Sequence, residues 1–266
     1  MKLHPVHGKH STHLTDADAR PPASAKKGDA LKEAIAEETD RISECQRVLY
    51  ADARYALLIV LQGRDASGKD GTIRKVFSAV NPQGCTVASF KEPTELEKRH
   101  DFLWRVHQQV PARGMIGIFN RSHYEDVLVP RVHKLVPKKV WSARYDQIND
   151  FERMLTENNV VILKFLLHVS REEQAKRFEE RLADPKKNWK FRVGDLDDRA
   201  QWSEFTKAYR GILNHTSTNW APWYLVPADD KEVRDWLVAR TIADCLERLH
   251  LQYPAMDKSL SDIKID

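Results

Sequence analysis

The chain has 266 residues, of which 41% are hydrophobic and 31% charged, and its 43 basic and 39 acidic side chains leave a net charge of +4. This length can bury the core of one domain, and the near balance of charge does not by itself indicate a nucleic-acid-binding protein. The sequence has neither a signal-peptide pattern nor an apolar run of roughly 18 residues, the length that a membrane-spanning helix needs. We therefore expect a soluble, cytoplasmic protein with no membrane or nucleic-acid partner.

The first 28 residues differ in composition from the rest of the chain. They contain a Pro21-Pro22 pair and almost no apolar pattern, and four histidines recur at every third residue: His4, His7, His10 and His13. We interpret residues 1–28 as a flexible N-terminal tail rather than as a metal site. From Asp29 to about Asp52, apolar residues recur near the helical period, which predicts a long amphipathic helix at the start of the main domain, residues 29–266.

Five apolar segments are predicted to form the strands of a parallel sheet. The first, YALLIVLQ, is a continuous apolar run, which is typical of a strand buried on both faces. The chain between the segments is long enough for crossover helices. The strand candidates are residues 55–62, 86–90, 115–119, 160–169 and 223–228. The predicted fold class is therefore α/β, with a five-stranded parallel sheet between helices.

Two helix starts have the spacing of a capping box, in which a Ser or Thr and a Glu three residues later satisfy each other's backbone N–H groups. These pairs are Thr94 with Glu97 and Ser170 with Glu173, and the second pair follows a predicted strand directly. Both pairs support the alternation of strands and helices.

A phosphate-binding loop (P-loop) follows the first predicted strand. Residues 63–72, GRDASGKDGT, satisfy the pattern G-x-x-x-x-G-K. Such a loop surrounds phosphate oxygens with backbone N–H groups at the positive end of the next helix and adds a lysine charge. We expect Lys69 to be exposed to these phosphates and to contribute little to the core.

Two acidic residues distinguish this loop from that of an ordinary ATPase. Asp70 replaces the Ser or Thr that usually follows the lysine, and Asp65 lies inside the loop. A bare carboxylate would repel phosphate unless a divalent cation bridges the two, so we interpret Asp65 as a magnesium ligand or as a residue that positions the attacking oxygen. The alternative is that Asp65 only shapes the turn.

A second polar segment, NRSHYEDVLVPRVH (120–133), follows the third predicted strand. Open parallel sheets bind ligands at the carboxyl ends of their strands. The planar guanidinium of Arg121 suits phosphate oxygens. Asn120 stands where a magnesium-binding Asp would be expected, and Glu125, one helical turn further on, could supply that carboxylate. The alternative is that Glu125 pairs with Arg121 or Arg131. His123 and His133 are expected to pack or to form hydrogen bonds.

Several longer motifs resemble those of the polyphosphate kinase 2 family, and the resemblance covers nearly everything after the tail. The motifs are G-x-D-x-x-G-K-D-G-T at the loop, NPQG (81–84), LWRVHQQVP (103–111), FNRSHYEDVLV (119–129) and WKFRVGDLDDR (189–199). Asn120 and Glu125 make the chain similar to the class III branch. That branch accepts AMP and ADP and makes nucleotides from polyphosphate.

The resemblance implies a helical lid at about residues 183–202, which closes over the phosphates. Without it, the basic segment KKNWKFR (186–192) would be interpreted as a solvated surface loop. Lys190, Arg192 and Arg199 are the implied phosphate contacts. Trp189 and Phe191 are expected to anchor the lid to the body, and the alternative is that they stack on a base. A closed basic lid excludes water from phosphoryl transfer. The family also implies a homo-oligomer, with a tetramer as the expected form.

The implied activity is that of a P-loop kinase, which transfers a phosphoryl group from inorganic polyphosphate to AMP or ADP with Mg²⁺, or alternatively Mn²⁺. Adenine nucleotides are the expected acceptors, and guanine nucleotides are left open. The expected catalytic residues are Asp65, Lys69, Arg121 and Glu125, with metal held by Asp65 and Glu125. The expected polyphosphate contacts are Gly63, Ala66, Ser67, Gly68, Lys69, Asp70, Gly71, Arg74, Lys75, Arg121, Lys190, Arg192 and Arg199. The expected nucleotide contacts are Phe77, Asn81, Asn120, Glu125, Asp126, Val129 and Arg131.

Two other functions are compatible with the same loop. An ATP-dependent nucleoside or nucleotide kinase would share the fold, because the fold and the loop do not identify the phosphoryl donor. A non-catalytic polyanion-binding protein would bind phosphate with a steep salt dependence but transfer nothing. The carboxylates Asp65 and Glu125 favour an enzyme, since they would have no purpose in a purely basic groove.

Overall fold

The computed structural model describes residues 1–8 and 12–255, so His10 of the N-terminal segment and the end of the main domain, 256–266, lie outside the described residues. One parallel sheet forms the centre of the molecule, with the strand order β2-β3-β1-β4-β5. The strands are β1 (Ala56–Gln62), β2 (Cys85–Ser89), β3 (Ile116–Asn120), β4 (Val160–His168) and β5 (Trp223–Pro227). The predicted five-stranded parallel sheet is confirmed.

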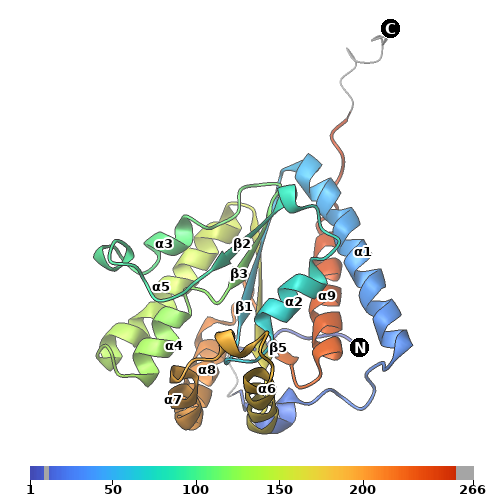
Figure 1. Cartoon of the computed structure of the whole chain (residues 1–266). Helices are drawn as coiled ribbons and strands as arrows, with labels where there is room; N and C mark the ends of the chain where they lie inside the picture. Colours follow the sequence, from blue (N-terminus) through green and yellow to red (C-terminus); the bar gives the residue numbers. More distant parts are fainter. Residues whose placement is uncertain (9–11, 256–266) are drawn as a thin grey trace.

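Helices cover both faces of the sheet (Figure 1). One face packs against α1 (Asp29–Asp52), α2 (Lys69–Val76) and α9 (Lys231–Glu247). The other face packs against α3 (Trp104–His107), α4 (Glu125–Val132), α5 (Lys138–Glu157) and α8 (Trp202–Thr216). Residues of β1 alternate between the two cores, Leu57 and Ile59 in one and Leu58 and Val60 in the other. This double burial explains why the first strand is a continuous apolar run.

The remaining α-helices lie at the carboxyl edge of the sheet (Figure 1). They are α6 (Arg171–Ala183) and α7 (Gly194–Ala200), with the short 3-10 helix η4 (Asn188–Lys190) between them. Ser170 caps α6 by accepting from the N–H of Glu173 at 3.2 Å, but only this half of its predicted capping box forms, because the N–H of Ser170 donates to Asp229 at 2.8 Å. Thr94 and Glu97 form their predicted box in full, but they precede a single 3-10 turn, η3 (Glu97–Arg99), and not an α-helix. No helix among the described residues is long and apolar enough to cross a membrane.

The N-terminal segment differs from the flexible tail that its composition predicts. Pro5 forms an antiparallel bridge with Tyr224, and the N–H of Val6 donates to the carbonyl of Trp223 at 2.8 Å, so the segment covers the free edge of β5. A 3-10 helix, η1 (Asp16–Ala19), follows, and Ala19 is fully buried. Backbone hydrogen bonds and single buried residues produce no hydrophobic periodicity, so the sequence does not indicate that this segment packs on the sheet.

Candidate active site at the carboxyl edge of the sheet

The two polar segments meet because β1 and β3 are neighbours in the sheet. Leu61 pairs with Asn120 in the parallel register, so the residues after both strands begin side by side. The N–H of Arg121 donates to the carbonyl of Leu61 at 3.0 Å and continues the ladder by one residue. Arg121 has a φ of 63°, in the left-handed region that costs a side-chain-bearing residue about 1–3 kcal/mol. The turn directs this guanidinium toward the P-loop.

The glycines of the P-loop are required by close contacts as well as by backbone conformation. A Cβ at Gly68, where φ is 100°, would lie 1.9 Å from Nη1 of Arg234. A Cβ at Gly63, where φ is 152°, would lie 2.5 Å from the carbonyl oxygen of Leu167. Both contacts are shorter than non-bonded atoms allow. The two glycines of the sequence pattern therefore serve the packing of the loop on β4 and α9.

Side chains hold the carbonyl oxygens of the P-loop from Gly63 to Ser67. Lys69 donates to the carbonyls of Gly63 at 2.8 Å and Arg64 at 3.2 Å. The remaining donors are Gln174 to Asp65 at 2.9 Å, Arg177 to Ala66 at 2.9 Å and Arg234 to Ser67 at 3.3 Å. Three cations thus compensate the negative ends of the loop's peptide dipoles. This arrangement favours an anion at the loop.

Lys69 is buried, with 8% of its surface exposed, so the expectation of an exposed lysine is wrong. Its ammonium needs acceptors at this depth, and the carbonyls of its own loop supply them. Burial, followed by the nearby charge of Arg121, lowers the pKa of Lys69 to about 8. Lys69 therefore stabilises the loop itself, in addition to any phosphate that the loop binds.

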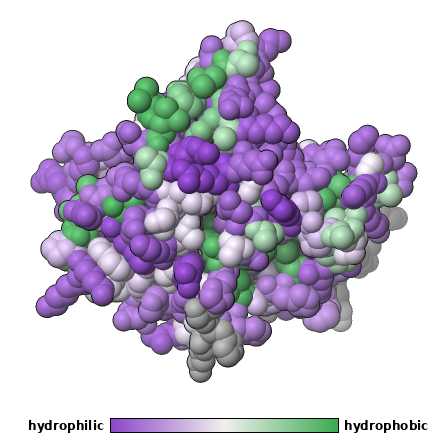
Figure 2. Space-filling view, turned by 90° about the horizontal axis from the view of Figure 1, so that it is seen from below, coloured by the Kyte–Doolittle hydropathy of each residue, from purple (hydrophilic) through white to green (hydrophobic). Residues whose placement is uncertain are grey.

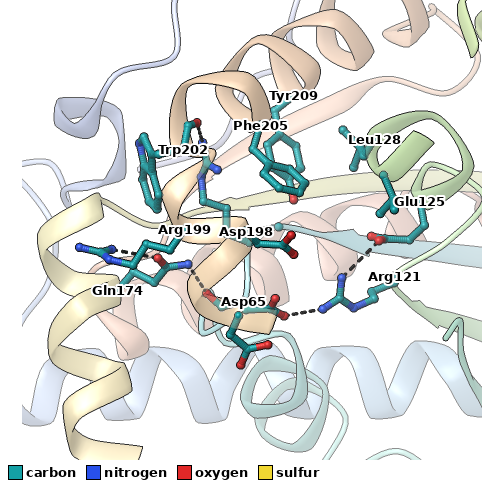
Figure 3. A pocket seen from close by; sticks show the side chains of 14 residues that line it. Asp65, Arg121, Glu125, Leu128, Gln174, Asp198, Arg199, Trp202, Phe205 and Tyr209 are labelled. Carbon is teal, nitrogen blue, oxygen red and sulfur yellow. Dashed lines mark hydrogen bonds and ion pairs between the residues drawn. The ribbon is translucent and has the colours of Figure 1, made fainter. Parts of the chain in front are cut away.

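Arg121 lies between the two predicted catalytic carboxylates. Its Nη2 forms an ion pair with Oδ1 of Asp65, and its Nη1 lies 3.2 Å from Oε2 of Glu125 (Figure 3). The second oxygen of Glu125 accepts from Nε2 of Gln62 at 2.8 Å. The charge of Glu125 is the main cause that raises the pKa of Arg121 and keeps its guanidinium protonated.

These contacts distinguish the two expected metal ligands. Both oxygens of Glu125 accept from protein groups, which matches the alternative in which Glu125 pairs with Arg121. In residues 1–8 and 12–255, no three His, Cys, Asp or Glu side chains gather in a group that could hold a metal ion. Mg²⁺ at phosphate sites is often held by one or two carboxylates together with substrate oxygens. Asp65 fits this pattern, because it lines the cavity beside the P-loop and its contact with Arg121 uses one oxygen, Oδ1.

A cavity opens beside the P-loop. Its lining includes six predicted site residues: Gly63, Asp65, Arg121, Glu125, Val129 and Arg199. Sequence reasoning missed the rest: Arg64, Leu128, Gln174, Asp195, Asp198, Trp202, Phe205 and Tyr209. The surrounding face of the molecule is mostly hydrophilic (Figure 2). The three aromatic residues come from α8 and form one wall of the cavity (Figure 3).

Arg64 attaches the P-loop to this aromatic wall. Its guanidinium carbon lies 3.7 Å from the ring centroid of Trp202, and its Nη2 donates to the hydroxyl of Thr206 at 2.6 Å. Burial lowers the pKa of Arg64 to about 10, so the side chain is still protonated at neutral pH. The stacked cation fixes α8 beside the loop.

Four of the expected nucleotide contacts lie away from the lining of the cavity. Phe77 packs against the core at the far end of α2, and Asn81 caps the 3-10 helix η2 (Pro82–Gly84). Asp126 pairs with Arg105 at 3.1 Å, and Arg131 donates to the hydroxyl of Tyr145 at 3.1 Å. A fifth, Asn120, donates to Asp70 at 2.7 Å. These five residues contact other parts of the protein and do not line the cavity.

The lid segment joins α6 to α8 across the carboxyl edge. Lys190 lies 3.7 Å from Asp70 at the start of α2, and the ring of Phe191 packs edge-on against Phe178. Trp189 is 72% exposed, so it does not anchor the lid as expected. The side chains of Arg192, Arg74 and Lys75 are exposed.

The two predicted structural histidines are confirmed in that role. His123 is buried, and its Nε2 lies 3.2 Å from Glu152. The Nε2 of His133 lies 2.9 Å from Asp198.

The P-loop between β1 and α2, the parallel sheet and the segment that joins α6 to α8 across the carboxyl edge together define a P-loop kinase. The family model of polyphosphate kinase 2 matches residues 25–254, and the chain therefore belongs to the polyphosphate kinase 2 family.

Relatives with known names agree with this assignment. The chain is 52% identical to an AMP/ADP-polyphosphate phosphotransferase of Meiothermus ruber, over 89% of each chain. It is 46% identical to an ADP-polyphosphate phosphotransferase of Rhodopseudomonas palustris, over 84% of this chain and 81% of the relative. The crystal structure of polyphosphate kinase 2 from Arthrobacter aurescens TC1 superimposes with a TM-score of 0.88 at 37% identity, covering 99% of this chain and 96% of that one.

Proposed function

We propose that this chain is a polyphosphate-dependent nucleotide kinase, which transfers terminal phosphoryl groups from inorganic polyphosphate to AMP or ADP. Membership of the polyphosphate kinase 2 family supports the reaction, and the names of the relatives from M. ruber and R. palustris support the acceptors. The observation that carries the proposal is the position of Arg121. Its guanidinium lies between Asp65 of the P-loop and Glu125, at the mouth of a cavity with an aromatic wall.

Each part of the site has a task in the transfer. The P-loop binds the end of the polyphosphate chain, and Arg121 and Lys69 stabilise charge on the phosphoryl group in flight. Asp65 would hold Mg²⁺, or Mn²⁺ in its place, which supplies charge neutralisation between the two anionic substrates. Glu125 and Gln62 hold Arg121 in its orientation. The lid, with Lys190 and Arg199, excludes water that would hydrolyse the transferred group.

The transfer needs no strong general base. The acceptor is the terminal phosphate of AMP or ADP, which is already an anion at neutral pH. His123 is buried against Glu152 and is therefore unavailable for proton transfer in the cavity. This assignment leaves charge stabilisation and positioning as the whole of the protein's contribution.

The aromatic wall extends the proposal to the base of the acceptor. The rings of Trp202, Phe205 and Tyr209 line the cavity, with Arg64 covering one face of Trp202. Aromatic packing does not discriminate between bases, so we propose that guanine nucleotides are accepted alongside adenine nucleotides. We further propose a homo-oligomer, with a tetramer as the expected form. Its molar mass by light scattering and a comparison of rates with ADP and GDP test these two statements.

The donor is tested by incubating the protein with ADP and polyphosphate in the absence of ATP and following ATP with luciferase. A parallel reaction without polyphosphate corrects for ATP formed from two ADP molecules, and a Lys69→Met preparation, in which transfer should be abolished, corrects for contaminating kinases. ATP that requires polyphosphate and the wild-type protein supports the proposal. Transfer only from ATP to AMP would identify the ATP-dependent kinase instead. Salt-sensitive binding of polyphosphate without any transfer would identify the polyanion-binding protein.

A further inference from the structure

Gln174 connects the lid to the P-loop through both ends of its amide. The side chain lies on α6, with 3% of its surface exposed. Its Nε2 donates to the carbonyl of Asp65 at 2.9 Å, and its Oε1 accepts from Nη1 of Arg199 at 3.0 Å (Figure 3). Arg199 belongs to α7, the helix of the lid. One buried side chain therefore contacts a loop carbonyl and a lid cation at the same time.

The chemistry of the two partners fixes the orientation of this amide. A backbone carbonyl can only accept a hydrogen bond, and a guanidinium can only donate. The amide of Gln174 must therefore turn its nitrogen to Asp65 and its oxygen to Arg199. A carboxylate could keep the contact with Arg199 but would meet the carbonyl of Asp65 with a second acceptor. An apolar side chain of the same length would lose both contacts.

The hydrogen bonds continue from Gln174 into the site. Asp65, whose carbonyl Gln174 holds, forms the side-chain ion pair with Arg121, and Arg121 contacts Glu125 (Figure 3). The path thus runs from the lid cation to the guanidinium that lies between the two carboxylates. Arg199 is also held by the carbonyl of Arg171 at 2.8 Å, at the start of α6, so it reaches Gln174 from a defined position.

We propose that Gln174 is a positioning residue that couples the docked lid to the geometry of the P-loop. When Arg199 lies against α6, it orients the amide of Gln174, which then holds the backbone of Asp65 where its carboxylate meets Arg121. When the lid leaves, the amide oxygen of Gln174 loses its donor, Arg199, and the amide no longer fixes the loop. The coupling makes phosphoryl transfer efficient only under a closed lid. This inference deepens the proposed function and rests on it.

A double-mutant cycle tests the coupling. The measured quantity is kcat/KM for polyphosphate at saturating ADP, for wild type, Gln174→Met, Arg199→Met and the double variant. Each single change should lower kcat/KM about 10- to 100-fold, since a charge-assisted hydrogen bond or a buried group without a partner is lost. Because the two residues act through one path, kcat/KM of the double variant should be only slightly lower than that of the less active single variant. Losses that multiply in the double variant would overturn the proposal, as would an unchanged Gln174→Met.

Controls separate positioning from folding. Gln109→Met makes the same substitution at an exposed position and should leave kcat/KM unchanged. Thermal unfolding of each variant shows whether the fold is intact. If Gln174→Met does not fold, the cycle is measured with Gln174→Glu and Arg199→Lys, where the proposal again predicts non-multiplying losses. A wild type that is inactive with polyphosphate would refute the proposed function, whereas an active wild type with multiplying losses would refute only the coupling.

Discussion

Arg121 donates from Nη1 to Oε2 of Glu125 at 3.2 Å, four residues further along the same turn. The other Glu125 oxygen accepts from Gln62. Glu125 is therefore placed to orient the guanidinium, and we propose Asp65 as the carboxylate that would hold metal. The two roles have different consequences for the magnesium dependence of the reaction.

Glu125→Gln should lower the rate of transfer at every magnesium concentration without moving the midpoint of the magnesium titration. Asp65→Asn should move that midpoint to higher concentration, because a ligand is lost. The measurement is the initial rate of ATP formation from ADP and polyphosphate against magnesium concentration, for both variants and the wild type. A shifted midpoint in Glu125→Gln would contradict this assignment and identify Glu125 as a metal ligand.

Gly68→Ala should destabilise the protein by about 1–3 kcal/mol, because φ is 100° and the new Cβ would meet Arg234. Gly71→Ala is the matched control, three residues later in the same motif. Its Cβ would lie 3.5 Å from Arg234, an ordinary contact, and Ala is the better helix former in α2. Urea unfolding should show a clear loss for the first variant and a neutral or stabilising effect for the second. Equal changes in stability for the two variants would contradict the conclusion that Arg234 leaves no room for a Cβ at position 68.

Lys69 should take up protons when polyphosphate binds at pH 8. Its pKa in the free protein is lowered to about 8, chiefly by burial, so a large fraction is neutral there. A polyanion favours the protonated ammonium and raises this pKa, whereas at pH 6 the lysine is protonated before and after binding. Calorimetry in buffers with different ionisation enthalpies measures the uptake. The Lys69→Met variant should abolish transfer and lack this component of the uptake, and an identical uptake in the variant would rule out Lys69 as its source.

Lys164 of β4 and Glu152 of α5 form a buried ion pair at 2.5 Å, in which Lys164 has no exposed surface and also donates to the hydroxyl of Tyr124. Lys164→Met alone should cost about 3–5 kcal/mol, because the carboxylate of Glu152 is left without its cation. The double variant Lys164→Met, Glu152→Leu should be more stable than either single variant. Free energies of unfolding in urea check this order, and a double variant less stable than both would contradict it.

The elements that carry strong local signals could be predicted from the sequence. The apolar run of β1 and the helical period of α1 match the structure to within a residue, because double burial and an amphipathic surface impose those patterns. The P-loop has a sequence pattern because its glycines must avoid Leu167 and Arg234. Arg121 and Glu125 follow from the rule that parallel sheets bind ligands at their carboxyl ends.

The residues that the prediction missed come from distant parts of the chain. Trp202, Phe205 and Tyr209 lie on an amphipathic helix, whose apolar face looks the same in sequence whether it meets a core or a cavity. Gln174 is one polar residue on α6 with no motif around it. Phe77, an expected nucleotide contact, follows α2, which carries it about 12 Å from the loop at the rise of an α-helix.

The most direct test of the central claim is a phosphorus NMR experiment on the wild-type protein with AMP, polyphosphate and magnesium, in the absence of ATP. The account predicts that signals of ADP appear first and the β-phosphate signal of ATP follows, while the mean chain length of the polyphosphate falls by the amount transferred. A reaction in which AMP is phosphorylated when ATP is supplied, but remains unchanged with polyphosphate alone, would contradict it.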